Sequence, residues 1–125
     1  MKMINVKDKL PPAGHYSQAV MSNGLVFLSG ILPIDQQTGE KFSSASFDKQ
    51  VKLVFENLIN VLKECEMTTN HLVKVNVYIK NAENWATFND LFADFMGNHK
   101  PARTVIPVQE LHYGLLIELD AIAEL

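Results

Sequence analysis

The stretch HLVKVNVYIK, residues 71–80, decides the fold because apolar and polar side chains alternate along it. A period of two residues is typical of a β-strand with one face buried and the other facing outward. The apolar face carries Val73, Val75, Val77 and Ile79, and the polar face carries Lys74, Asn76, Tyr78 and Lys80. The sequence therefore predicts a strand here that is covered on one side only.

Patterns with helical spacing precede and follow this strand in the sequence. The first begins at Ser46, a good N-cap with Asp48 in the first turn, and ends near residue 64. Its apolar residues recur every three or four positions: Phe47, Val51, Val54, Phe55, Leu58, Val61 and Leu62. The second pattern spans residues 82–97, where Gly97 is a C-terminal cap and the apolar face is formed by Trp85, Phe88, Leu91, Phe92 and Phe95.

The remaining segments predict further strands. Residues 17–22 and 24–30 are joined by Asn23-Gly24, the pair favoured in two-residue hairpin turns, and residues 31–42 read as a loop. Additional strands are expected at 3–6, 102–108 and 115–123. We therefore expect a single α+β domain over residues 1–125, with one mixed sheet and both helices on one face.

The last predicted strand is apolar on both faces. One side carries Leu115, Ile117, Leu119 and Ala121, and the other carries Leu116, Glu118, Asp120 and Ile122. A face that mixes two large aliphatic residues with two carboxylates is too apolar to be simply solvated. We therefore expect the uncovered face of the sheet to mediate self-association.

Composition excludes several classes of function. The net charge of -3 gives no basic footprint for nucleic acid. No segment reaches the roughly 18 apolar residues that span a bilayer, so no membrane partner is expected. The N-terminus has no apolar stretch of signal-peptide length, which favours a cytoplasmic location. Four dispersed histidines and a single cysteine, Cys65, offer no metal site, and Cys65 is expected to be a buried thiol.

The stretch HKPARTVIP, residues 99–107, contains the only arginine, Arg103. Arg103 shares a strand face with Val105 and Pro107. The opposite face, with Thr104, Ile106 and Val108, suits the helix-covered core. Arg103 is therefore expected to face a partner subunit, where its planar fork could grip a carboxylate. The alternative is an ion pair with Glu118 or Asp120 that merely orients the sheet.

Other polar residues are weaker candidates. Glu118 and Asp120 share a strand face and are interpreted either as chemical groups or as solvated or interface carboxylates. Tyr16 and Ser29 carry hydroxyls beside glycines, where backbone can approach a ligand closely. For Ser29 the competing interpretation is an ordinary turn residue.

Five motifs over residues 11–123 resemble the Rid (YjgF-type) family of reactive enamine/imine deaminases. They are GHYSQAV, LVFLSGILPID..TGE, ENLINVLKE, VKVNVYIKN and HKPARTVIPV...LLIELDAIA. This resemblance implies a chorismate-mutase-like fold, a homotrimer whose sheets form a central barrel, and ligand clefts between neighbouring subunits.

The resemblance also implies an activity. It is the hydrolytic deamination of 2-aminoacrylate or 2-iminobutanoate to a 2-oxo acid and ammonia, without a cofactor. Arg103 would bind the substrate carboxylate and Glu118 would handle water or protons, as the two catalytic residues. The implied substrate-binding residues are Tyr16, Ser29, Gly30, Arg103 and Val105.

Two departures bear on activity. The family often has cysteine where this chain has Val105, and proline where it has His15, which is otherwise interpreted as an exposed loop residue. The alternative hypothesis is a non-catalytic trimeric protein that binds small carboxylates or acts as a regulator. Ribonuclease activity, ascribed to some relatives, ranks last because no basic patch is present.

Overall fold

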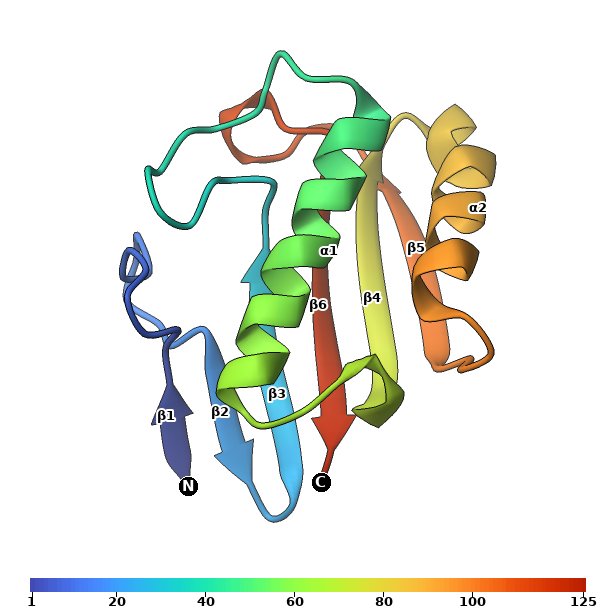
Figure 1. Cartoon of the computed structure of the whole chain (residues 1–125). Coiled ribbons are helices and arrows are strands. Elements are labelled where there is room, and N and C mark those ends of the chain that lie inside the picture. The colour runs from blue at the N-terminus through green and yellow to red at the C-terminus, as the bar shows by residue number, and fades with distance from the viewer.

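The strand predicted at 71–80 is β4 (Leu72–Lys80), the fifth strand of a six-stranded sheet and the neighbour of its edge strand β5. The computed structural model describes all residues, 1–125. The sheet order is β1-β2-β3-β6-β4-β5 (Figure 1). The other strands are β1 (Lys2–Ile4), β2 (Ala19–Ser22), β3 (Leu25–Ile31), β5 (Ala102–Val108) and β6 (Ile117–Glu124). Thus β4 pairs with β6 antiparallel and with β5 parallel.

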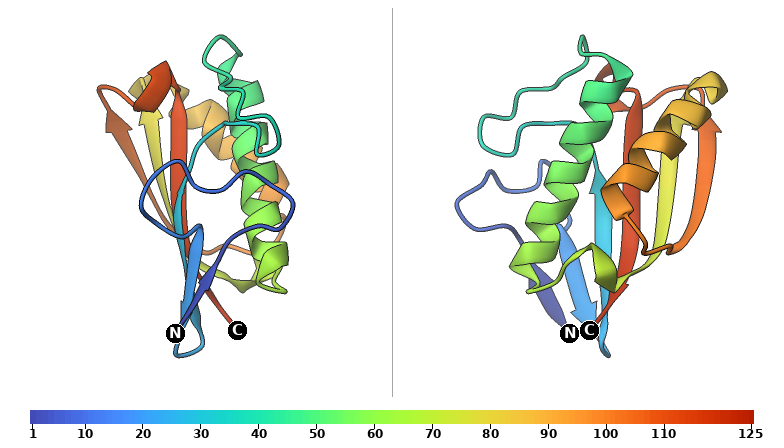
Figure 2. Two further views of the ribbon diagram at one scale, coloured as in Figure 1. Left: turned by 90° about the vertical axis from the view of Figure 1, so that its left-hand side faces the viewer. Right: turned by 45° about the vertical axis from the view of Figure 1, so that its right-hand side comes forward.

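Two helices cover one face of this sheet. They are α1 (Phe47–Glu64) and α2 (Trp85–Met96), and the edge-on view in Figure 2 shows both on the same side. Helix α2 is the crossover that a parallel β4–β5 pair requires. Three short 3₁₀ turns complete the chain: η1 (Thr69–His71), η2 (Ala82–Asn84) and η3 (His112–Gly114). The prediction of a mixed α+β sheet with both helices on one face is confirmed.

The core lies between the helices and the sheet. Val75, Val77 and Ile79 of β4 are fully buried there, next to Ile117 and the other inward residues of β6. Because the helices cover only one face of the sheet, the alternation of β6 predicts its faces correctly, with Leu119 and Ala121 inward and Glu118, Asp120 and Ile122 outward. None of the helices is long and apolar enough to cross a membrane.

The predicted turn and caps are confirmed. Asn23 and Gly24 both have positive φ, 51° and 78°, as a type I′ turn requires, and they connect β2 to β3. The Ser46 hydroxyl accepts a hydrogen bond from the Lys49 amide at the start of α1. Gly97 ends α2 with φ 66°. Cys65 follows α1 as a buried thiol, and burial raises its pKa.

The prediction that Val73 shares the buried face of β4 is wrong. Leu72 pairs with Ala123 and Lys74 with Ile122, so Val73 is an extra residue at a bulge. Its side chain is 43% exposed, and Leu72 is buried instead. A bulge shifts the alternation by one residue, which a strict period of two cannot anticipate.

The prediction that Trp85 belongs to the buried apolar face of α2 is also wrong. Trp85 is the first residue of α2 and is 47% exposed, whereas Phe88, Phe92 and Met96 enter the core. The Trp85 ring instead lies near the Arg103 guanidinium, 5.9 Å from ring centroid to guanidinium carbon.

The uncovered face of the sheet is partly apolar, as predicted. Phe27 is 44% exposed and Ile106 is 37% exposed, and both point away from the helices. Polar side chains lie among them: Lys74 donates to the Thr104 hydroxyl at 2.8 Å. Self-association through this face stays a prediction.

Candidate functional site

Four of the predicted site residues lie close together at the end of β3: Tyr16, Ser29, Gly30 and Glu118. The pairing of β3 with β6 shifts between Leu28 and Ile31, so Ser29 and Gly30 lie at an irregularity rather than in the regular ladder. The Ser29 hydroxyl donates to the Ser17 carbonyl at 2.6 Å, and its amide donates to the Gln18 carbonyl at 2.9 Å. Ser29 therefore ties the strand to the segment that carries Tyr16.

Gly30 permits the close approach of Glu118. A Cβ added at Gly30 would collide with the Glu118 carboxylate, which lies directly over the glycine backbone. Glu118 projects from β6, next to Tyr78 of β4 in the ladder. Burial raises the pKa of the Glu118 carboxyl, the nearby His112 lowers it, and Asp120 raises it. The result is a half-buried carboxylate that binds protons more readily than an exposed one.

Asp120 has a different role from Glu118. Its carboxylate accepts hydrogen bonds from the Asn76 amide at 2.8 Å and from the Tyr78 hydroxyl at 2.9 Å. The bond to Asp120 raises the pKa of Tyr78. Asp120 is thus engaged by the side chains of the neighbouring strand, and the interpretation of it as an interface or structural carboxylate fits best.

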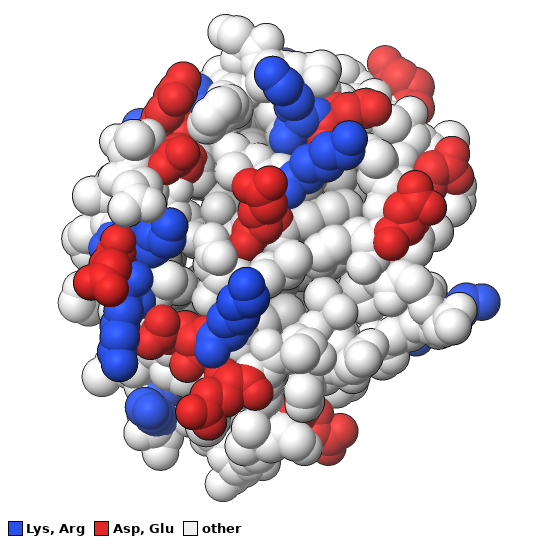
Figure 3. Space-filling model, in the orientation of Figure 1, with Lys and Arg blue, Asp and Glu red and all other residues white.

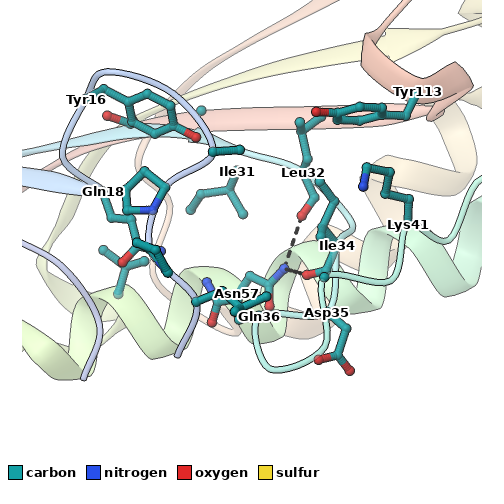
Figure 4. A pocket seen from close by; sticks show the side chains of 18 residues that line it. Tyr16, Gln18, Ile31, Leu32, Ile34, Asp35, Gln36, Lys41, Asn57 and Tyr113 are labelled. Carbon is teal, nitrogen blue, oxygen red and sulfur yellow. Dashed lines mark hydrogen bonds between the residues drawn. The ribbon is translucent and has the colours of Figure 1, made fainter. Parts of the chain in front are cut away.

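The cavity beside these residues has a volume of about 200 Å³. The loop of residues 10–18 forms one wall, and the loop of residues 31–41 forms another. Figure 4 shows Tyr16 on one side and Tyr113 and Lys41 on the other. Asn57 of α1 holds the second loop by donating to the carbonyls of Leu32 at 3.1 Å and Ile34 at 2.9 Å. Tyr16, Ser29 and Gly30, all predicted substrate-binding residues, line this cavity.

Arg103 lies elsewhere, and the face predicted for it is wrong. The parallel register places Arg103 opposite Val75 and Val105 opposite Val77, whose side chains are buried beneath the helices. Arg103 therefore points to the helix side. Its guanidinium carbon lies 5.1, 5.7 and 5.9 Å from the ring centroids of three residues of α2: Phe92, Phe88 and Trp85.

This placement excludes the second interpretation of Arg103, an intrachain ion pair with Glu118 or Asp120, and the carboxylate-binding interpretation stays a prediction. Glu118 and Asp120 project from the opposite face of the sheet, so no ion pair between them and Arg103 orients the sheet within one chain. The aromatic rings hold the guanidinium by cation–π contacts, which leave its hydrogen-bond donors available. Val105, on the same side of β5, packs partly buried against the core. Strands β6 and β4 separate this edge from Gly30.

Two residues of the cavity have no sequence signal. Lys41 and Tyr113 are 72 positions apart, and the Lys41 ammonium lies 4.7 Å from the centroid of the Tyr113 ring. Neither residue falls in a periodic pattern, since Lys41 follows an irregular loop and Tyr113 sits in η3 with φ 61°. Only the folded chain brings them together.

The charges of the chain do not form a single-sign patch on the helix-covered face. Figure 3 shows acidic and basic side chains interspersed there. Nowhere do three or more His, Cys, Asp or Glu side chains gather in an arrangement that could hold a metal ion. A guanidinium on aromatic rings and a half-buried carboxylate over a glycine are therefore the chemically distinctive groups.

Comparisons with known proteins agree with the fold and the motifs. The family model described as "Endoribonuclease L-PSP" matches residues 6–125. A RutC family protein of Pyrococcus abyssi is 37% identical, covering 98% of this chain and 96% of its own. Reactive Intermediate Deaminase A of Arabidopsis thaliana chloroplasts is 35% identical, covering 94% of this chain and 63% of its own.

A solved structure gives the same picture. A Rid-family protein of Yersinia pestis superposes with a TM-score of 0.91 at 33% identity, covering 99% of this chain and 98% of that chain. Sequence motifs, fold and family model thus converge, and the chain belongs to the endoribonuclease L-PSP family, which is the YjgF/Rid family that its motifs indicate.

Proposed function

We propose that this protein hydrolyses the C=N bond of reactive 2-imino and enamino acids, such as 2-aminoacrylate and 2-iminobutanoate, to 2-oxo acids and ammonia. The observation that carries the proposal is the Glu118 carboxylate lying over the bare backbone of Gly30, a residue that itself lines the cavity. The name of the Arabidopsis relative, a reactive intermediate deaminase, supports the same activity class.

The site requires two subunits. Arg103 and Glu118 project from opposite faces of one sheet with β4 between their strands, so one chain cannot apply both to a small molecule. Arg103 lies on the edge strand β5, where a neighbouring copy can approach it. In the proposed homotrimer, Arg103 of one subunit meets the Gly30 and Glu118 region of the next.

The chemistry needs no protein nucleophile, because the imine carbon is already electrophilic. Arg103 binds the substrate carboxylate through two parallel hydrogen bonds and fixes the C=N carbon in position. Water adds to that carbon while Glu118 accepts a proton from the water. The C=N electron pair moves to the nitrogen, which is protonated. The carbinolamine then loses ammonia as its hydroxyl proton leaves. The sum is imine plus water to 2-oxo acid plus ammonia.

The raised pKa of Glu118 fits this task. A carboxylate that binds protons more readily accepts one from water more easily, and burial is the main cause of the change. The Tyr16 ring and the Ser29 backbone shape the wall on which the substrate lies. Val105 makes the Arg103 side of the cleft apolar.

The test couples the purified protein to a threonine dehydratase and follows trapping of 2-iminobutanoate by semicarbazide. The protein should reduce semicarbazone formation in proportion to its concentration. Arg103→Lys should lose about a hundredfold or more in kcat/KM, because an ammonium cannot reproduce the bidentate fork. Lys100→Gln, at an exposed lysine near Arg103, is the matched charge control and should keep full activity.

An unchanged rate of semicarbazone formation at high protein concentration would refute deamination. Calorimetry with 2-oxobutanoate then tests the alternative hypothesis, a protein that binds small carboxylates without turnover. Binding without turnover, abolished by Arg103→Lys, would identify a protein that binds small carboxylates.

A further inference from the structure

The cavity beside Gly30 extends beyond what a four-carbon imine needs, to a lysine at its far wall. Its lining runs from Tyr16, Ser29 and Gly30 to Lys41 and Tyr113. We propose that Lys41 forms a second carboxylate subsite and that the preferred substrates are 2-imino dicarboxylic acids, the imines of acidic amino acids. This inference rests on the proposed function and names its substrate class.

The position of Lys41 is fixed from three directions. Its backbone pairs with Ile34 in an isolated antiparallel bridge. Its ammonium lies against the Tyr113 ring, a cation–π contact at 4.7 Å. The Tyr113 carbonyl accepts a hydrogen bond from the Ser43 hydroxyl at 2.7 Å, which joins the loop of Lys41 to η3. Figure 4 shows the Lys41 ammonium extending beneath the Tyr113 ring.

The backbone of Tyr113 supports the idea of a built wall. Tyr113 has φ 61° and ψ 19°, a left-handed conformation that a bulky residue rarely adopts. Surrounding contacts must hold such a conformation in place, and it turns the ring toward Lys41. The Tyr113 ring is 53% exposed and the Lys41 side chain is exposed, so their contact places the ammonium at the outer rim of the cavity.

The charge of Lys41 is not neutralised inside the cavity. Asp35 is the only carboxylate among the lining residues, and its oxygen accepts hydrogen bonds from the amides of Gln37 at 2.7 Å and Thr38 at 2.9 Å. In Figure 4 the Asp35 carboxylate points away from Lys41. An unpaired cation at the rim of the cavity can form a charge-assisted hydrogen bond with an anionic group of a ligand.

The two ends of the substrate then have separate partners. Arg103 of the neighbouring subunit holds the carboxylate next to the C=N carbon, and Glu118 attends to the water. The side-chain carboxylate reaches past Gly30 to Lys41. Lys41 is a specificity-determining residue in this scheme and takes no part in the hydrolysis itself.

Binding is measured first, because it does not depend on turnover. Calorimetry compares 2-oxoglutarate with 2-oxopentanoate, which has the same chain length and lacks the second carboxylate. The protein should bind 2-oxoglutarate more tightly. Lys41→Gln should weaken 2-oxoglutarate binding by about tenfold, as expected for a charge-assisted hydrogen bond. The same substitution should leave 2-oxopentanoate binding unchanged.

Lys9→Gln is the matched control. Lys9 is also a lysine of the loops around the cavity, but it bonds to Gln37 at 3.0 Å and does not line the cavity. It should leave both affinities unchanged. Equal binding of the two oxo acids, or equal loss from Lys9→Gln and Lys41→Gln, would overturn the subsite.

Turnover separates this inference from the proposed function. An amino-acid oxidase supplies the imines of glutamate and norvaline in a semicarbazide assay. If Lys41→Gln lowers kcat/KM for the glutamate imine alone, both proposals hold. If both imines react equally well in wild type and variant, deamination stands and the subsite is wrong. If neither imine reacts while 2-oxoglutarate still binds through Lys41, the subsite stands and deamination is wrong.

Discussion

Glu118 on β6 and Arg103 on β5 come from the last two strands of the chain, yet their surroundings differ. Glu118 belongs to a strand with neighbours on both sides, half-buried over Gly30 beside a cavity walled by its own chain. Arg103 belongs to the edge strand, and its guanidinium rests on the aromatic face of α2. One half of the candidate site is thus assembled within the chain, and the other is presented at its edge. Under the proposed function, one chain therefore leaves the site incomplete.

The largest expected effect comes from mixing Arg103→Ala and Glu118→Gln subunits, which tests whether the two residues share a site across subunits. Arg103→Ala and Glu118→Gln should each abolish deamination, whereas trimers assembled from a mixture of the two should recover activity. Random assembly of equal amounts leaves about one site in four with both native residues. The deaminase assay on co-refolded protein measures the recovery.

Refolded Arg103→Ala alone is the control and should stay inactive. Mixed oligomers, verified by native mass spectrometry, that remain inactive would show that the two residues do not share a site across subunits.

Gly30→Ala tests whether activity depends on the position of the Glu118 carboxylate over residue 30. The added Cβ displaces the Glu118 carboxylate, so kcat/KM should fall about tenfold or more as the proton acceptor leaves its position. Unfolding temperature should change little, because the displaced atoms are the end of a flexible side chain. Steady-state kinetics and thermal unfolding test both statements.

The smallest expected effect is that of Glu118→Gln on the unfolding temperature. Burial raises the folded-state pKa of this carboxyl above its unfolded value. The stability that protonation provides is present below the unfolded-state pKa and is lost as the pH rises through the folded-state pKa. Glutamine avoids the charge, so the variant should unfold a few degrees higher than the wild type at neutral pH, with the gain shrinking in acid.

Thermal unfolding across the pH range tests this prediction. Glu56→Gln, at an exposed position of α1, is the control and should show no such trend. A gain for Glu118→Gln that is constant with pH would contradict the assigned burial of the charge.

Much of the fold could be predicted from the sequence because its strongest signals are local. Asn23-Gly24 predicts its hairpin through positive φ, and Ser46 predicts the start of α1 through its capping hydroxyl. The alternation of β6 identifies both of its faces because the covering helices bury one side completely. The motif resemblance predicts the family, which the family model confirms.

The errors share a physical cause: each depends on pairing or covering by distant residues. Val73 is displaced by a bulge that only the register with β6 creates. Arg103 was assigned to the wrong face because β5, as an edge strand, is similarly apolar on both sides. Its true face follows from the parallel register with β4. Lys41 and Tyr113 could not be found because no pattern connects a loop to a turn so far along the chain.

The amino-acid sequence by itself determined the elements, their order and the family, because turns, caps and periodicity are properties of neighbouring residues. The tertiary structure alone decided which face Arg103 takes, why a side chain at position 30 would displace Glu118, and where an unpaired lysine meets a cavity. These depend on strand register and close approach between remote segments, which no local pattern specifies.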